Sequence, residues 1–63
     1  MTNFDITINA LKSDDNMYKF NWFMMRGWDV DARLYLQEIT GATEETARTI
    51  TDLYNAGELR CYL

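Results

Sequence analysis

Apolar and polar residues alternate at the start of the chain, over the stretch "FDITINAL" (residues 4–11). The apolar residues occupy every second position: Phe4, Ile6, Ile8 and Ala10. A period of two that includes β-branched residues is typical of a strand with one face in solvent. The pattern therefore predicts a β-strand. A turn is expected in the next stretch, "KSDDN" (residues 12–16), because such side chains readily bond to their own backbone.

The stretch "MYKFNWFMM" (residues 17–25) begins with the same alternation, since polar residues separate the larger apolar ones. This predicts a second strand, and with the first strand it predicts a β-hairpin over residues 1–28. A helix is the alternative for residues 17–25, because Tyr18, Trp22 and Met25 also fall on one side of a helix.

A helical pattern begins at Asp29, shortly after Gly27, which permits a change of chain direction. Asp29 can accept hydrogen bonds from the free amides of the first turn, and Asp31 adds a favourable charge there. The helix is expected to run through "VDARLYLQEIT" and to end at Gly41, a typical C-cap residue. Its main apolar face would carry Ala32, Tyr35, Leu36 and Ile39. Val30 and Leu34 form a second apolar face, so we expect neighbours on two sides of this helix.

A second helix is expected over "EETARTITDLYNA", with Thr43 as its N-cap and Gly57 at its end. Its buried stripe would consist of Ala47, Ile50, Leu53 and Tyr54. Its opposite face would carry Glu44, Glu45, Arg48, Asp52 and Asn55. The final stretch "ELRCYL" (residues 58–63) alternates again and predicts a third strand.

Together these elements predict an α+β fold, a single compact domain over residues 1–63 with the order ββααβ. A hairpin over residues 1–28 and a strand over residues 58–63 would form a small antiparallel sheet. The helical hairpin of residues 29–57 would pack on that sheet.

The composition limits how this domain can be stabilised. With 63 residues the chain lies near the lower size limit for independent folding. One Cys cannot form an internal disulfide, and without His no zinc set is available, so stability must come from apolar burial. The start of the chain does not resemble a signal peptide, and no apolar run is long enough for a membrane helix. With Cys61 as a lone thiol, these features predict a soluble cytoplasmic protein with no membrane association.

The formal net charge of −4 is concentrated in the second half of the chain. Residues 29–58 contain seven acidic residues and only two basic ones, Arg33 and Arg48. Phosphate backbones attract proteins with stripes of Lys and Arg, so this segment would repel nucleic acid. Basic proteins would be attracted to it instead.

The segment from Tyr35 to Leu63 resembles the helix-turn-helix of winged-helix DNA-binding proteins. The positions that carry the resemblance are Leu36, Ile39, Gly41, Thr43, Glu45, Ile50, Leu53 and Gly57. The resemblance implies a recognition helix followed by a strand of the wing, and a role as a DNA-binding transcriptional regulator. The exposed face of that helix would carry Glu44, Glu45 and Asp52, whereas DNA readers present basic or amide side chains.

Catalytic chemistry is not indicated by the residues present. General acid–base catalysis at neutral pH most often uses His, and the chain has none. The acidic pairs at Asp14, Asp29 and Glu44 are explained by a turn and two helix starts. No glycine-rich phosphate loop occurs. We therefore expect no enzymatic activity, no catalytic residues, no cofactor and no metal site.

The remaining signal is the concentration of aromatic residues and Met in "MYKFNWFMMRGW" (residues 17–28), which one small core cannot enclose completely. Interfaces are enriched in aromatic residues, Met and Arg. The predicted apolar anchor consists of Trp22, Phe23, Met25, Arg26 and Trp28. The predicted electrostatic part consists of Glu44, Glu45 and Asp52.

These features predict a small acidic protein-binding module without direct nucleic-acid binding. It would be an inhibitor of the DNA-mimic or anti-CRISPR type, made by a phage or another mobile element, that occupies a basic nucleic-acid-binding surface of a host protein. A winged-helix-like DNA-binding regulator is one alternative. An oligomeric structural or assembly protein, with a homodimer formed through "WFMM", is the other.

Overall fold

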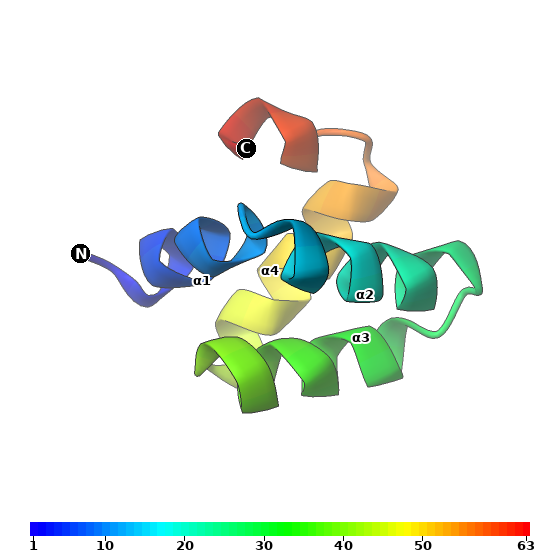
Figure 1. Ribbon diagram of the computed structural model, residues 1–63, viewed down its shortest axis with the longest axis horizontal. Helices are drawn as coiled ribbons and strands as arrows, with labels where there is room; N and C mark the ends of the chain where they lie inside the picture. The colour runs from blue at the N-terminus through cyan, green and yellow to red at the C-terminus, as the bar shows by residue number, and fades with distance from the viewer.

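Helices account for all the regular structure of this protein (Figure 1). The computed structural model describes residues 1–63. The α-helices are α1 (Asn3–Leu11), α2 (Asp14–Met25), α3 (Asp29–Tyr35) and α4 (Glu44–Asn55). A π-helical turn, η1 (Leu36–Thr40), continues α3, and a 3₁₀ turn, η2 (Leu59–Tyr62), ends the chain. Helices α2 and α3 lie side by side, and α4 crosses behind them.

The predicted α+β class and the order ββααβ are therefore wrong. Residues 1–28 form α1 and α2 rather than a hairpin, and residues 58–63 contain a 3₁₀ turn rather than a strand. The wing strand implied by the helix-turn-helix resemblance is likewise not formed. No sheet exists for the helices to pack on, and the core lies between the helices themselves.

Helix α1 forms because its buried positions follow a helical spacing. Thr7, Ile8 and Leu11 are buried, and Phe4 packs against them, which is one stripe of an amphipathic helix. Ile6, which a strand would have placed with Phe4 and Ile8, is 45% exposed. The hydroxyl of Thr7 donates to the carbonyl of Asn3 at 3.0 Å, so a polar residue can occupy the buried stripe.

The start of α1 is stabilised by a reciprocal cap. The backbone N–H of Asp5 donates to Thr2 Oγ1 at 3.1 Å, and the backbone N–H of Thr2 donates to Asp5 Oδ2 at 3.4 Å. This capping box satisfies two amides that the helix leaves free. Its Thr-x-x-Asp spacing is a local signal for a helix start.

The helical alternative for residues 17–25 is confirmed by α2. Phe20 and Met24 are buried, and Met17 and Phe23 pack against them, again at helical spacing. The stretch "KSDDN" contains the helix start rather than the turn of a hairpin. Ser13 is the N-cap residue of α2, and Asp14 and Asp15 place two carboxylates in the first turn, near the positive end of the helix dipole.

The predicted helix from Asp29 to Gly41 is confirmed in its extent. Gly41 ends it with a φ of 71°, in the left-handed region that favours glycine. The carboxylate of Asp29 does not cap the helix but accepts a hydrogen bond from Asn55 Nδ2 at 2.9 Å. The expectation of neighbours on two sides is wrong, because Val30 and Leu34 are exposed, and Ile39 is exposed as well.

The prediction for α4 is confirmed. Thr43 is the N-cap, and its hydroxyl oxygen accepts from the backbone N–H of Thr46 at 3.1 Å. Ala47 and Ile50 are buried, and Leu53 and Tyr54 pack against the core. The opposite face of α4 is exposed, as its polar composition requires.

Every helix contributes to one core. Its buried members are Ile8, Leu11, Phe20, Met24, Ala32, Leu36, Ala42, Ala47, Ile50 and Leu59. Leu59 is 3% exposed, so the 3₁₀ turn is attached to the core by a single buried side chain. No buried side-chain nitrogen or oxygen lacks a hydrogen-bond partner, and the packing is therefore compatible with a dry interior.

No helix here combines the length and the apolar character that crossing a lipid bilayer demands.

Candidate functional site

Helices α2 and α3 and the turn between them bring four aromatic rings together. The ring of Trp22 lies 5.4 Å from that of Phe23 and 5.3 Å from that of Trp28, both in edge-to-face geometry. The rings of Phe23 and Trp28 are 6.5 Å apart, and Phe23 also lies 5.9 Å from Tyr35. Such pairs contribute about 0.5–1.5 kcal/mol beyond the area that they bury.

The backbone of the α2–α3 connection explains this arrangement. The N–H of Trp28 donates to the carbonyl of Phe23 at 3.0 Å, and the N–H of Gly27 donates to that of Met24 at 3.0 Å. These two bonds form a Schellman motif, which requires a left-handed residue, and Gly27 has a φ of 74°. The motif turns the chain back so that Trp28 meets the side chain of Phe23.

Arg26 fixes Trp22 from the solvent side. Its guanidinium carbon lies 3.7 Å from the centre of the Trp22 ring, and its Nη1 donates to the Trp22 carbonyl at 3.2 Å. A cation over an indole ring at an exposed position contributes about 0.5–1 kcal/mol. The ring of Trp22 therefore packs against both Arg26 and Trp28.

Much of this apolar surface is open to solvent. Tyr18 and Met25 are 71% and 73% exposed, and Trp22 and Trp28 are 36% and 47% exposed. We call these four residues, with the half-buried Phe23 beneath them, the aromatic face. Between Tyr18, Lys19, Trp22 and Phe23 lies a shallow hollow of about 200 Å³.

The predicted site residues thus fall into two sets. Trp22, Phe23, Arg26 and Trp28 are brought into contact, and Met25 lies beside them on the outward side of α2. The three carboxylates lie on α4: Glu44 and Glu45 border an open hollow of about 470 Å³ with Thr43 and Arg48, and Asp52 follows two turns later. All three are exposed, and none lines the hollow of the aromatic face.

Tyr18 belongs to the aromatic face although the sequence analysis did not include it among the site residues. The signal was present, because Tyr18, Trp22 and Met25 share one side of a helix at the spacing i, i+4 and i+7. In a strand, Tyr18 and Trp22 would share one face with Phe20 and Met24, so the strand prediction did not separate the exposed side from the buried side.

Two tyrosines attach α2 to the neighbouring helices. The hydroxyl of Tyr35 donates to Asn16 Oδ1 at 3.1 Å, and the hydroxyl of Tyr54 donates to Asn21 Oδ1. Burial raises the pKa of Tyr35 above its ordinary value, and the negative charge of Asp15 adds to this shift. Elsewhere, no three His, Cys, Asp or Glu side chains gather as a metal site would need.

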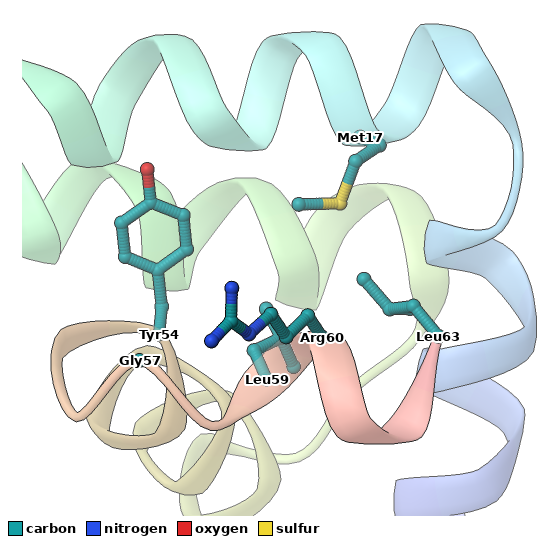
Figure 2. A pocket seen from close by; sticks show the side chains of 6 residues that line it. All are labelled: Met17, Tyr54, Gly57, Leu59, Arg60 and Leu63. Carbon is teal, nitrogen blue, oxygen red and sulfur yellow. The ribbon is translucent and has the colours of Figure 1, made fainter.

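A further cavity, of about 320 Å³, lies at the C-terminal end of the chain (Figure 2). It is lined by Met17, Tyr54, Gly57, Leu59, Arg60 and Leu63. Sequence reasoning missed this cavity, because its residues come from α2, α4 and η2 and no local pattern connects them.

Comparisons of the chain with protein-family models, with curated proteins and with solved structures find no match. Any functional assignment must therefore come from the surface of this protein itself.

Proposed function

We propose that this protein is a small acidic protein-binding module, anchored by its aromatic face in an apolar groove of a partner protein whose surroundings are basic. The observation that carries the proposal is the joint exposure of Tyr18, Trp22, Met25 and Trp28 on one face. Large aromatic and Met side chains that form a contiguous exposed patch are typical of interfaces.

The rigidity of the aromatic face supports this role. Trp22 is fixed between Trp28 and the guanidinium of Arg26, and Trp28 is fixed by the turn at Gly27. A side chain that is ordered before binding loses less conformational entropy when the complex forms. Trp and Arg are also the residue types that most often dominate binding energy.

The charge distribution supports a basic partner. The chain has a formal net charge of −4, and Glu44, Glu45 and Asp52 are exposed along α4. Such a surface accelerates association with a positively charged protein and slows association with nucleic acid. The narrower form of the proposal is an inhibitor of phage or mobile-element origin that occupies a nucleic-acid-binding surface in the cytoplasm. The exposed thiol of Cys61 is compatible with a reducing compartment.

Capture from a bacterial lysate with matched variants tests the anchor. The double variant Tyr18→Ser/Met25→Ser removes the two most exposed apolar side chains of the aromatic face. The matched control, Val30→Ser/Leu34→Ser, removes two exposed apolar side chains of α3 outside it. We expect the wild type and the control to retain the same basic protein, and the Tyr18/Met25 variant to bind that purified protein at least about tenfold more weakly.

Three results would overturn the proposal. Equal binding by both double variants would show that the aromatic face is not the anchor. A stable dimer in light scattering that the Tyr18/Met25 variant dissociates would assign the face to a second copy of the chain. Direct binding of random duplex DNA, weakening steeply with salt, would favour the DNA-binding alternative.

Charge reversal tests the electrostatic part. Glu44→Lys/Glu45→Lys should slow association with the purified partner and reduce its salt dependence, because the acidic start of α4 is lost. The loss of helix-dipole interactions should cost about 0.3–1 kcal/mol per residue in unfolding free energy. An unchanged association rate would assign these carboxylates to solubility alone.

A further inference from the structure

The cavity at the C-terminal end is an open groove with mainly apolar walls. Its volume of about 320 Å³ lies at the lower end of the range for ligand pockets, and four of its six lining residues are hydrophobic. Its walls are Met17 of α2, Tyr54 at the end of α4, and Leu59, Arg60 and Leu63 of the C-terminal segment. The aromatic face contributes none of them.

Backbone hydrogen bonds form the turn that places one wall of the cavity. The N–H of Glu58 donates to the Leu53 carbonyl at 2.9 Å, and the N–H of Gly57 donates to that of Tyr54 at 3.0 Å. These bonds form a second Schellman motif, with Gly57 at a φ of 74°. The motif turns the chain after α4 so that η2 lies beside the α4 end and Leu59 enters the core.

The wall formed by Tyr54 is fixed as well. Its ring packs edge-to-face on Phe20 with the ring centres 5.7 Å apart, and its hydroxyl donates to Asn21. Because that hydroxyl already has an acceptor, Tyr54 presents mainly the apolar part of its ring to the cavity.

The one charged group in the lining is the guanidinium of Arg60, which Figure 2 shows extending into the cavity between Tyr54 and Met17. Arg26 is stacked on Trp22 and donates to a carbonyl, whereas none of the side-chain hydrogen bonds found in the chain involves Arg60. No acidic residue lines the cavity. A guanidinium fork pairs best with a carboxylate, and the apolar walls suit a hydrocarbon tail.

We propose that this cavity binds a small carboxylate with an apolar tail, with the carboxylate paired to Arg60 and the tail between Met17, Leu59 and Leu63. The ligand class follows from charge complementarity: a carboxylate pairs with the guanidinium of Arg60, whereas a cation would meet it unfavourably. This site is independent of the aromatic face.

Titration of the full chain with octanoate, followed by backbone amide NMR, tests the assignment. Octylamine serves as a probe with the same tail length but a positive charge, and acetate as a carboxylate without the tail. We expect saturable binding of octanoate, with chemical-shift changes at residues 17, 54 and 57–63. Octylamine and acetate should bind at least about tenfold more weakly.

Substitutions at Arg60 and Leu63 test the site in folded protein. Arg60→Gln should weaken octanoate binding by about tenfold or more, whereas the matched control Arg48→Gln, on the exposed face of α4, should not change it. Leu63→Asp, at a position that is 43% exposed, should abolish binding by placing a like charge beside the ligand. Circular dichroism verifies that each variant is folded. Equal affinity for octylamine, an unaffected Arg60→Gln variant, or shifts confined to the aromatic face would each overturn the proposal.

Discussion

Helices α2 and α4 have the same length, 12 residues, and both bury one stripe in the same core, yet their outward faces differ. On α4 the outward residues are Glu44, Glu45, Arg48, Thr49 and Asp52. On α2 the exposed side chains include Tyr18, Trp22 and Met25 as well as charged residues. Both helices therefore bury apolar side chains in the core, but α4 exposes polar residues to solvent and α2 also exposes aromatic residues and Met.

The difference between these two outward faces shows which exposed side chains the fold does not require. α4 shows that a polar outward face is sufficient for a helix of this domain. The outward side chains of Tyr18 and Met25 on α2 are 71% and 73% exposed and contribute little burial, so the core does not account for them. The proposed binding role would account for them, which is why the proposed anchor lies on α2.

The helices also differ in how their ends and sides are held. Thr43 caps α4 with its own side chain, whereas Ser13 makes no side-chain cap bond at the start of α2. α2 instead accepts hydrogen bonds from Tyr35 on α3 and Tyr54 on α4. The start of α4 thus has a side-chain cap that the start of α2 lacks.

The largest expected effect on stability is a difference between substitutions on the buried and the exposed face of α2. Phe20→Ala should lower the free energy of unfolding by about 3–5 kcal/mol, because Phe20 is fully buried and packs on Tyr54. That loss is comparable to the whole stability that a core of this size provides. Tyr18→Ser, two positions away and exposed, should change it by less than about 0.5 kcal/mol. Thermal unfolding followed by circular dichroism measures both, and similar midpoints for the two variants would contradict the assignment of inner and outer faces.

A smaller effect tests the caps. Thr43→Ala should cost about 0.5–2 kcal/mol, because the backbone N–H of Thr46 loses its acceptor. Ser13→Ala is the matched substitution at the start of α2 and should cost less than about 0.5 kcal/mol, since no cap bond is lost. Urea denaturation of both variants gives the comparison. If Ser13→Ala were the more damaging substitution, α2 would depend on its own cap after all.

The smallest effect tests the attachment of α2 through Tyr35. Tyr35→Phe removes the hydrogen bond to Asn16 and should cost about 0.5–1.5 kcal/mol at neutral pH. The folded-state pKa of Tyr35 is raised above 10.0, so the unfolded chain releases this proton first. The stability contributed by Tyr35 is therefore present below about pH 10 and is lost as the pH rises through the raised pKa. The difference between wild type and Tyr35→Phe should shrink from about pH 8 to about pH 11, whereas a constant difference would contradict the shift.

Part of the fold could be predicted from short-range patterns. The helices of residues 29–57 were predicted correctly, because the residues that begin and end them lie only a few positions apart. Examples are Thr43 with Thr46 and the glycine at position 41. Residues typical of helix starts also occur at Thr2 and Asp5 and at Ser13 and Asp14. There the alternation of apolar and polar residues predicts strands instead.

The error in the first 28 residues has a specific cause. Positions 4 and 8 lie on the same face in both a strand and a helix, because four is a multiple of two and also close to one helical turn. The discriminating positions were Thr7 and Leu11, which only a helix buries together with them. Thr7 counts as a polar residue in the sequence pattern, although its hydroxyl bonds to the helix backbone and the side chain is buried.

For the candidate site, the sequence by itself determined that an aromatic cluster follows residue 17, that Gly27 interrupts it, and that the following helices carry the acidic residues. Only the tertiary structure decided which side of α2 faces solvent, that Val30, Leu34 and Ile39 are exposed, and that Met17, Tyr54 and Arg60 enclose a cavity. The physical reason is range. Caps and turns are formed by hydrogen bonds between residues close in the chain, whereas burial depends on which distant elements pack together.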